Sequence, residues 1–256
     1  MHDFSYNGVS LSGFAGRILQ APVHTVAKRN VEMVKIYGRS GDDVIDNESY
    51  DNVDFSLKIG FLPHLTAYNA QTLAEAVIDW LAPLQNGYYT YRDTLNNGYF
   101  TQALLKNFGE VKRELRTLLT ETLRFSRVPY WYSDAGAVAV TAVNGYATLH
   151  NPEQYDAEPV IDIQYTGSSS SNAHMYIKGN GTEFADIVIG GITPTHILDA
   201  VTGQHYRMVD GAKVYLSPVL PPNIPANTTY TYSAFIQGHS WGEDFTMQIT
   251  PNWRRL

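Results

Sequence analysis

The sequence predicts a mainly β protein with one prominent helix, and three observations support this prediction. In residues 53–61, apolar and polar side chains alternate, a period of two that is typical of a strand with one buried face. After residue 61 the period becomes helical within a single segment. Residues 134–256 then contain short apolar runs separated by Gly, Pro, Asn and Ser clusters, a pattern that indicates a β-sandwich.

The first 61 residues are predicted to form strands only. Asn7-Gly8 predicts a tight turn between two short strands, because both residues accept positive φ angles. After a bend at Pro22, residues 31–36 and 53–61 are expected to form the two strands of a long hairpin. A polar, glycine-punctuated connection separates them, and its residue types favour turns. We therefore expect a hairpin whose connection protrudes.

This charged connection allows three interpretations. The first is a solvated loop. The second is a metal or phosphate site, since Asp42, Asp43 and Asp46 lie close in sequence, but the fuller ligand pattern of a calcium-binding loop is missing. The third is an arm that reaches a neighbouring subunit. The residues by themselves leave the choice open.

One helix is predicted between residues 69 and 84. Asn69 is a suitable N-cap, and Thr72 and Glu75 have the spacing of a capping box. Apolar residues recur at helical intervals on one face as far as Leu84, and Gly87 lies just beyond the end. We expect this helix to pack on the sheet through that face.

Residues 88–128 contain one segment whose local signals disagree. A turn at residues 96–98 separates two tyrosine-rich strands. Residues 110–124 then have helical spacing of their apolar side chains and a helix-favouring composition, whereas residues 123–128 alternate as in a strand. Residues 110–117 stay open between helix and strand.

Small residues near position 134 mark a change of pattern, and we place a domain boundary there. The predicted domains are residues 1–133 and 134–256. The candidate strands of the second domain are residues 160–165, 173–177, 184–189, 196–199, 213–216, 228–236 and 245–249.

The composition is that of an ordered protein with few charged groups. Hydrophobic residues make up 44% of the 256 residues, so disorder is not expected and a sizeable core can form. Charged residues make up only 17% of the chain, whereas there are 18 tyrosines. Few charged and many aromatic residues are typical of sheet-rich proteins and of permanent interfaces. The net charge of -7, without a cluster of Lys and Arg, argues against nucleic acid as the main ligand.

Several classes of function lack their sequence signals. There is no cysteine, and therefore no disulfide, zinc-thiolate site or cysteine nucleophile. We find no serine-hydrolase elbow, no zinc-binding histidine pair and no nucleotide-binding loop. The acid pairs Glu153/Asp156 and Glu243/Asp244 are ordinary on an acidic surface. We expect no catalytic site, metal or cofactor, and because no signal peptide or apolar span is evident, we expect synthesis in a cytoplasm without membrane insertion.

Several short motifs, in order along nearly the whole chain, resemble the distal tail protein (Dit) family of long-tailed, siphovirus-type bacteriophages. The likeness is greater in the first half than in the second. The motifs are Phe4-Ser5-Tyr6-Asn7-Gly8-Val9-Ser10-Leu11-Ser12, Glu32, Gly38-Arg39-Ser40-Gly41-Asp42, Asp51-Asn52-Val53, Gly87-Tyr88 with Asp93, Pro129-Tyr130 and Ile249-Thr250-Pro251-Asn252-Trp253-Arg254.

The resemblance implies a fold and a structural role. It implies an N-terminal β-sandwich or split barrel with a protruding hairpin, a C-terminal galectin-like sandwich, and strands over residues 118–128. It also implies a homohexameric ring in the virion that joins the tail tube protein to the hub of the tail tip or baseplate, and it leaves open whether a receptor-binding protein docks on the ring. On this hypothesis the protruding loop contacts a neighbouring subunit or an axial partner. The predicted contact residues are Arg39, Ser40, Asp42, Asp43 and Asp46.

The alternative is a carbohydrate-binding module for adhesion to the host. Aromatic residues of the C-terminal domain, such as Trp241 or Tyr206, would then form a platform for a sugar. Some Dit proteins carry inserted sugar-binding domains, but this chain is too short for such an insertion. We therefore rank the ring protein first.

Overall fold

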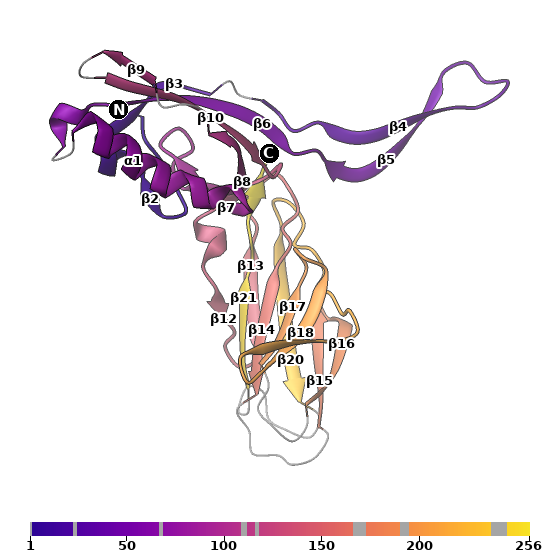
Figure 1. The fold of residues 1–256 in the computed structure, drawn as a ribbon. Coiled ribbons are helices and arrows are strands. Elements are labelled where there is room, and N and C mark those ends of the chain that lie inside the picture. The colour runs from indigo at the N-terminus through magenta and orange to yellow at the C-terminus, as the bar shows by residue number, and fades with distance from the viewer. Residues whose placement is uncertain are drawn as a thin grey trace. The chain divides into compact units, whose positions relative to one another are not determined.

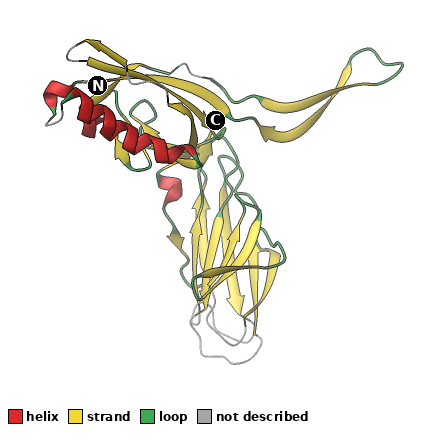
Figure 2. Cartoon of the chain, viewed as in Figure 1, coloured by secondary structure: helices red, strands yellow, loops and turns green. Residues whose placement is uncertain are grey.

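The computed structural model describes residues 2–22, 25–66, 69–108, 112–115, 118–165, 173–189, 195–236 and 245–256. Within these residues the protein consists mainly of antiparallel strands with one α-helix and a few short 3-10 turns (Figures 1 and 2). The predicted fold class is confirmed. The chain divides into two compact units, Met1–Trp131 with Leu256 and Tyr132–Arg255. No helix in the described ranges is long and apolar enough to cross a membrane.

The first unit is built on one antiparallel sheet, in the strand order β2-β1-β7-β8-β10-β6-β3. Strand β10 lies inside the sheet and pairs with β6 from Leu119 opposite Phe61 to Arg127 opposite Val53. The short strand β9 (Lys112–Leu115) pairs with the first part of β10. The strands are β1 (Phe4–Tyr6), β2 (Val9–Ser10), β3 (Gly16–Gln20), β6 (Val53–Phe61), β7 (Tyr88–Asp93), β8 (Tyr99–Phe108) and β10 (Leu118–Arg127).

Helix α1 (Ala70–Leu81) covers the core face of this sheet, where a second sheet would lie in a sandwich (Figure 2). Its N-cap is Asn69, whose Oδ1 accepts hydrogen bonds from the backbone N–H groups of Gln71 and Thr72 at 2.9 and 3.0 Å. The predicted cap is therefore confirmed. The predicted apolar face is buried against sheet residues such as Phe4 and Phe125, and its members in the helix are Leu73, Val77, Trp80 and Leu81.

The structure resolves most of the ambiguous segment in favour of strands. Leu118–Arg127 is strand β10, and Lys112–Leu115 is strand β9, while residues 109–111 and 116–117 lie outside the described residues. Leu119, Leu123 and Phe125 are buried on one face at a period of two. Two flanking strands supply the hydrogen bonds of β10, so pairing within the sheet overrides the local preference for a helix.

The prediction for residues 31–61 was wrong about which strands pair. The first strand, β4 (Arg29–Lys35), pairs with β5 (Asp42–Tyr50), a strand formed by most of the supposed connection. Strand β6 instead joins the main sheet between β10 and β3. Strand β5 was not predicted because its sequence is polar and does not alternate. A two-stranded ribbon with no core face needs no alternation of apolar and polar residues.

The second unit is a two-sheet sandwich around one hydrophobic core. Its larger sheet has the order β12-β21-β14-β17-β18-β19, and its smaller sheet has the order β13-β20-β15-β16. All seven predicted strands are present, whereas β12, β13, β18 and the two-residue β22 (Arg254–Arg255) were not predicted. The strands are β12 (Val140–Thr141), β13 (Tyr146–His150), β14 (Val160–Tyr165), β15 (Ala173–Gly179), β16 (Thr182–Ile189), β17 (Thr195–Asp199), β18 (Gln204–Val209), β19 (Ala212–Tyr215), β20 (Thr229–Ile236) and β21 (Phe245–Thr250).

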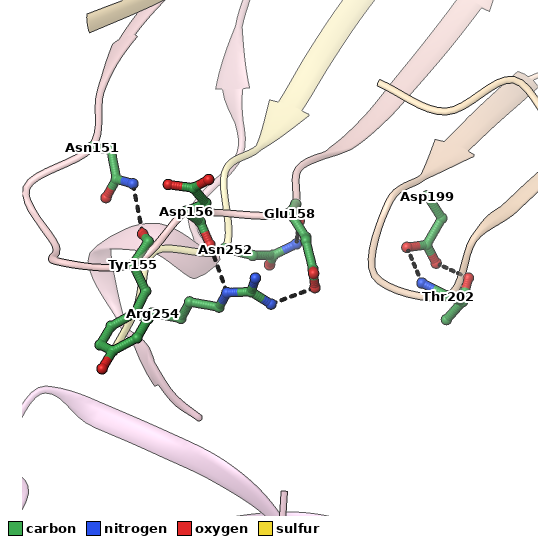
Figure 3. Close-up of polar contacts among 8 residues, drawn as sticks. All are labelled: Asn151, Tyr155, Asp156, Glu158, Asp199, Thr202, Asn252 and Arg254. Carbon is green, nitrogen blue, oxygen red and sulfur yellow. Dashed lines mark hydrogen bonds and ion pairs between the residues drawn. The ribbon is translucent and has the colours of Figure 1, made fainter. Parts of the chain in front are cut away.

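The C-terminal motif fastens the end of the chain to the second unit (Figure 3). The buried Arg254 side chain donates from Nε to the carbonyl oxygen of Asp156 at 2.6 Å and forms an ion pair with Glu158 at 2.5 Å. Asn252 donates from Nδ2 to the carbonyl oxygen of Glu158 at 2.9 Å. Trp253 packs so closely on Gly136 that an added Cβ there would lie 2.3 Å from the Trp253 nitrogen. Asn252, Trp253 and Arg254 belong to the motifs that resemble the Dit family, and their role in this structure is to hold the second unit together.

Two buried histidines lie side by side in the larger sheet. His196 Nδ1 is 3.4 Å from Nε2 of His205, and His205 Nδ1 is 3.0 Å from the carbonyl oxygen of Ser217. If His205 donates to Ser217, its Nε2 must accept from His196, and this leaves His196 Nε2 as an acceptor that has no partner among the described residues. Burial, together with the nearby His205 and Arg207, lowers the pKa of His196 from 6.5 to about 4.

We expect the second unit to lose stability on mild acidification because of His196. The folded state binds a proton less readily than the unfolded state, so this stability is complete above about pH 6.5 and is lost as the pH falls toward about 4. At about 1.4 kcal/mol per pKa unit, the loss approaches about 3 kcal/mol. Urea unfolding between pH 7 and pH 4.5 measures it.

The matched control for this prediction is His150, which is exposed on strand β13. His196→Gln is expected to reduce the pH dependence and to leave the part that comes from His205, whose pKa burial also lowers. His150→Gln is expected to leave the pH dependence as in the native chain. Equal pH profiles for the native chain and His196→Gln would contradict the assignment.

Candidate assembly arm

Strands β4 and β5 with their connecting turn form a two-stranded ribbon, residues 29–50, which we call the arm. In Figure 1 the arm projects from the sheet of the first unit. Among the described residues its two strands pair only with each other, in a register that sets Met33 opposite Val44 and Lys35 opposite Asp42. Gly38 and Gly41 have φ angles of 82° and 94°, so the turn uses backbone conformations that glycine adopts without strain.

The base of the arm is held to the first unit by specific contacts. The rings of Tyr50 and Tyr130 meet edge to face with centroids 5.9 Å apart. Asn52 donates from Nδ2 to the hydroxyl of Tyr88 at 2.6 Å. These contacts fix where the arm leaves the sheet, whereas its outer part has no core beneath it.

The charged residues predicted as contact residues are placed on the arm, where two of them bind each other. Arg39 Nη1 donates to Asp43 Oδ1 at 2.7 Å. Asp46 pairs with Arg29, whose Nε donates to Asp46 Oδ1 at 3.1 Å. The backbone N–H of Glu48 and then the Arg29 side chain lower the pKa of Asp46. The Asp46 carboxylate therefore stays ionised beside Arg29.

The other two predicted residues, Ser40 and Asp42, are exposed at the tip and at the start of β5. Asp42 lies opposite Lys35, a pair of opposite charges across the ribbon. That these residues contact a neighbouring subunit stays a prediction. Within the described parts of the chain, no three His, Asp or Glu side chains gather as metal ligands.

The arm also exposes apolar side chains that were not predicted as contact residues. Met33 is 67% exposed and Val44 is 58% exposed, and the two lie opposite each other on one face of the ribbon. Ile45 lies on the other face, and Tyr37 at the turn is fully exposed. Clustered exposed apolar groups indicate an interaction surface. The signal in the sequence was the run of apolar residues at positions 31, 33, 34 and 36, which does not alternate cleanly.

A second surface suited to assembly is the edge of the main sheet at β3. Among the described residues, β3 has a strand partner on one side only, strand β6. The free side is partly occupied, since the backbone N–H of Ile18 donates to the carbonyl oxygen of His2 at 3.1 Å. Leu19, on the same strand, is 43% exposed. Edge strands present backbone groups that can pair with another chain.

Known proteins match this chain in fold and not in sequence. The sequence matches no protein-family model and no curated protein. Solved structures do match. One is the crystal structure of SPP1 Dit, described as a paradigm of the hub adsorption apparatus in phages that infect Gram-positive bacteria, with a TM-score of 0.67 and 14% identity over 100% of both chains. The chain has the Dit fold.

A second solved structure also resembles this chain in fold. It is a chain in the phage p2 baseplate in its activated conformation with Sr, and it matches with a TM-score of 0.56 and 8% identity. The match covers 100% of this chain and 98% of the other. Both comparisons extend over both units, so the resemblance to Dit stated from the sequence motifs is confirmed by the fold.

Proposed function

We propose that this protein is a structural component of a phage tail tip, and that six copies form a ring joining the tail tube to the hub of the tip or baseplate. The observation that carries the proposal is the match in fold to SPP1 Dit over the full length of both chains. The exposed apolar arm supports it, because a two-stranded ribbon without a core is marginally stable in water and gains stability when a partner covers its apolar side chains.

The geometry suits a closed ring. A cyclic assembly requires each subunit to present two different, complementary surfaces. The arm supplies one surface, and the β3 edge supplies the other. Strand addition at an edge gives affinity through backbone hydrogen bonds, and side chains such as Met33 and Val44 give specificity.

In this proposal the two units have different tasks. Residues 1–133 form the ring, and residues 134–256 form a galectin-like sandwich. The partners are other copies of the chain, the tail tube protein and the hub protein, and a receptor-binding protein is a further candidate. The chain is made in the bacterial cytoplasm and acts in the virion without catalysis, nucleic acid or membrane insertion.

The native mass of the purified chain tests the ring. We expect six times the chain mass of 28.6 kDa at micromolar concentration, and negative-stain images that show a ring with a central opening. Because apolar contacts hold the arm, moderate salt is expected to leave the mass unchanged. A monomer in solution, together with an isolated copy in the mature tail, would overturn the proposal.

A further inference from the structure

The outer face of the smaller sheet in the second unit carries an unusual set of side chains. Strand pairing places Tyr176 opposite Phe235 on one side and opposite Asp186 on the other. Opposite residues of antiparallel strands share a face, and His174, two residues before Tyr176, shares it too. The inward side chains of the same strands, such as Met175 and Ile236, are buried in the core. We call His174, Tyr176 and Phe235 the aromatic row.

The rings of the aromatic row are adjacent and accessible. The centroids of Tyr176 and Phe235 are 5.2 Å apart, and those of His174 and Tyr176 are 6.1 Å apart with nearly parallel planes. All three residues are half-buried, so their rings are supported by the sheet and still reach solvent. Lys178 Nζ lies 4.8 Å from the centroid of the Phe235 ring, so a cation borders the row.

Polar groups stand beside the rings. His174 Nδ1 lies 2.8 Å from Asp186 Oδ1, and their side chains are 41% and 44% exposed. Away from the row, hydroxyl groups continue the face, with the Thr148 and Thr231 oxygens 3.0 Å apart. The face thus combines flat aromatic surface with hydrogen-bonding groups at its margin.

These observations favour one class of ligand. Charges of both signs, Lys178 against Asp186 and Glu183, give the face no net positive charge for a phosphate-rich polymer. Among the outward residues of these strands, Val188 is the only large aliphatic side chain that the structure describes as exposed, so the apolar part of this face consists mostly of flat aromatic rings. A sugar ring has an apolar C–H face and a rim of hydroxyl groups, which matches aromatic surface with polar margins.

We propose that the aromatic row is a binding site for a neutral saccharide chain. One sugar ring stacks on Tyr176 and Phe235, and its hydroxyl groups bond with Asp186 and Lys178. This site goes beyond the ring function and does not depend on it. It also differs from the platform predicted from sequence, because Tyr206 is only 8% exposed with Lys213 Nζ 4.2 Å from its ring centroid, and Trp241 lies outside the described residues.

Titration of the full chain with neutral oligosaccharides tests the site. The probes are tetrasaccharides of N-acetylglucosamine, glucose, galactose and rhamnose, measured by isothermal titration calorimetry and by saturation-transfer NMR. We expect at least one probe to bind with a millimolar or lower Kd. Tyr176→Ala and Phe235→Ala are each expected to weaken that binding by about tenfold, the loss of one aromatic stacking contact.

Two further variants test whether a loss of binding is specific to the aromatic row and the polar groups beside it. Tyr215→Ala removes an exposed ring from the other sheet and is expected to leave the affinity unchanged. Asp186→Asn keeps the size of the side chain and is expected to weaken binding several-fold, because the carboxylate accepts a hydrogen bond from a sugar hydroxyl group. Failure of all four probes to bind overturns the proposal, as does equal binding by the native chain and the Tyr176→Ala and Phe235→Ala variants. The native mass of each variant, expected to be unchanged, separates this result from the ring proposal.

Discussion

Replacing Met33 and Val44 by aspartate is expected to abolish the ring, so that the chain elutes as a monomer at micromolar concentration. The two side chains are opposite each other on one face of the arm and are 67% and 58% exposed in the isolated chain. If a neighbour covers this face, two carboxylates there must be desolvated without partners, which costs several kcal/mol per charge. Light scattering after size-exclusion chromatography measures the mass.

The matched control places the same charges on exposed valines of the second unit. Val138 and Val143 are 64% and 71% exposed, and the double aspartate variant at these positions is expected to remain hexameric. If the Met33 and Val44 variant also remains hexameric, the arm does not form the interface.

Substitution of Arg39 separates the charged from the apolar interpretation of the arm. The Arg39–Asp43 pair is exposed, and such pairs contribute at most about 1 kcal/mol. Arg39→Ala is therefore expected to weaken the ring less than the Met33 and Val44 variant does, with dissociation only on dilution. A ring that tolerates both Arg39→Ala and deletion of the loop would remove the arm assignment altogether.

Arg254→Ala is expected to destabilise the second unit by about 3 kcal/mol, the scale for breaking a buried, hydrogen-bonded ion pair. Only 9% of the Arg254 side chain is exposed, and it binds both Glu158 and the carbonyl oxygen of Asp156. Its loss leaves both acceptors without their cationic partner and also removes packing area. Hydrogen exchange measured by mass spectrometry should show faster exchange in strands β14 and β21.

Conservative and neighbouring substitutions provide the controls for Arg254. Arg254→Lys keeps the charge but lacks the planar fork that reaches both acceptors, so it is expected to recover less than half of the lost stability. Arg255→Ala, at the next position, is expected to have a small effect. Exchange in helix α1 should stay unchanged in all three variants, and equal protection of β14 in the native chain and Arg254→Ala would contradict the assigned role.

Local signals determined the helix and the turns. Asn69 caps α1 because its side chain satisfies N–H groups that any helix start leaves free, a requirement of the local chain alone. Asn7-Gly8 forms a turn with φ angles of 51° and 78° for the same kind of reason. The alternation in residues 53–61 likewise predicted β6, since one face of that strand meets the core.

Some segments owe their structure to residues that are distant in sequence, and local signals alone did not predict them. Residues 110–124 have helical spacing, so the strand over 118–128 was expected only from the resemblance and from the alternation of residues 123–128. It is confirmed as β10, which neighbouring strands hold on both sides. Strand β5 has no core face and therefore no period, so its pairing with β4 was missed. The sequence pointed to the charges of the arm as contact residues. Only the strand register, which sets Met33 opposite Val44, shows that the arm also carries an exposed apolar face.

By itself, the sequence determined the mainly β class, the capped helix and the resemblance to Dit. Backbone preferences and short motifs depend only on residues that are close in sequence, so they can be recognised without the fold. Tertiary structure alone decided which strands pair outside the tight hairpins, that Arg39 and Asp43 bind each other, and that Tyr176, Phe235 and Asp186 share one face. The physical reason is that strand pairing outside a hairpin joins residues far apart in sequence, and no local pattern specifies the partner of such a strand.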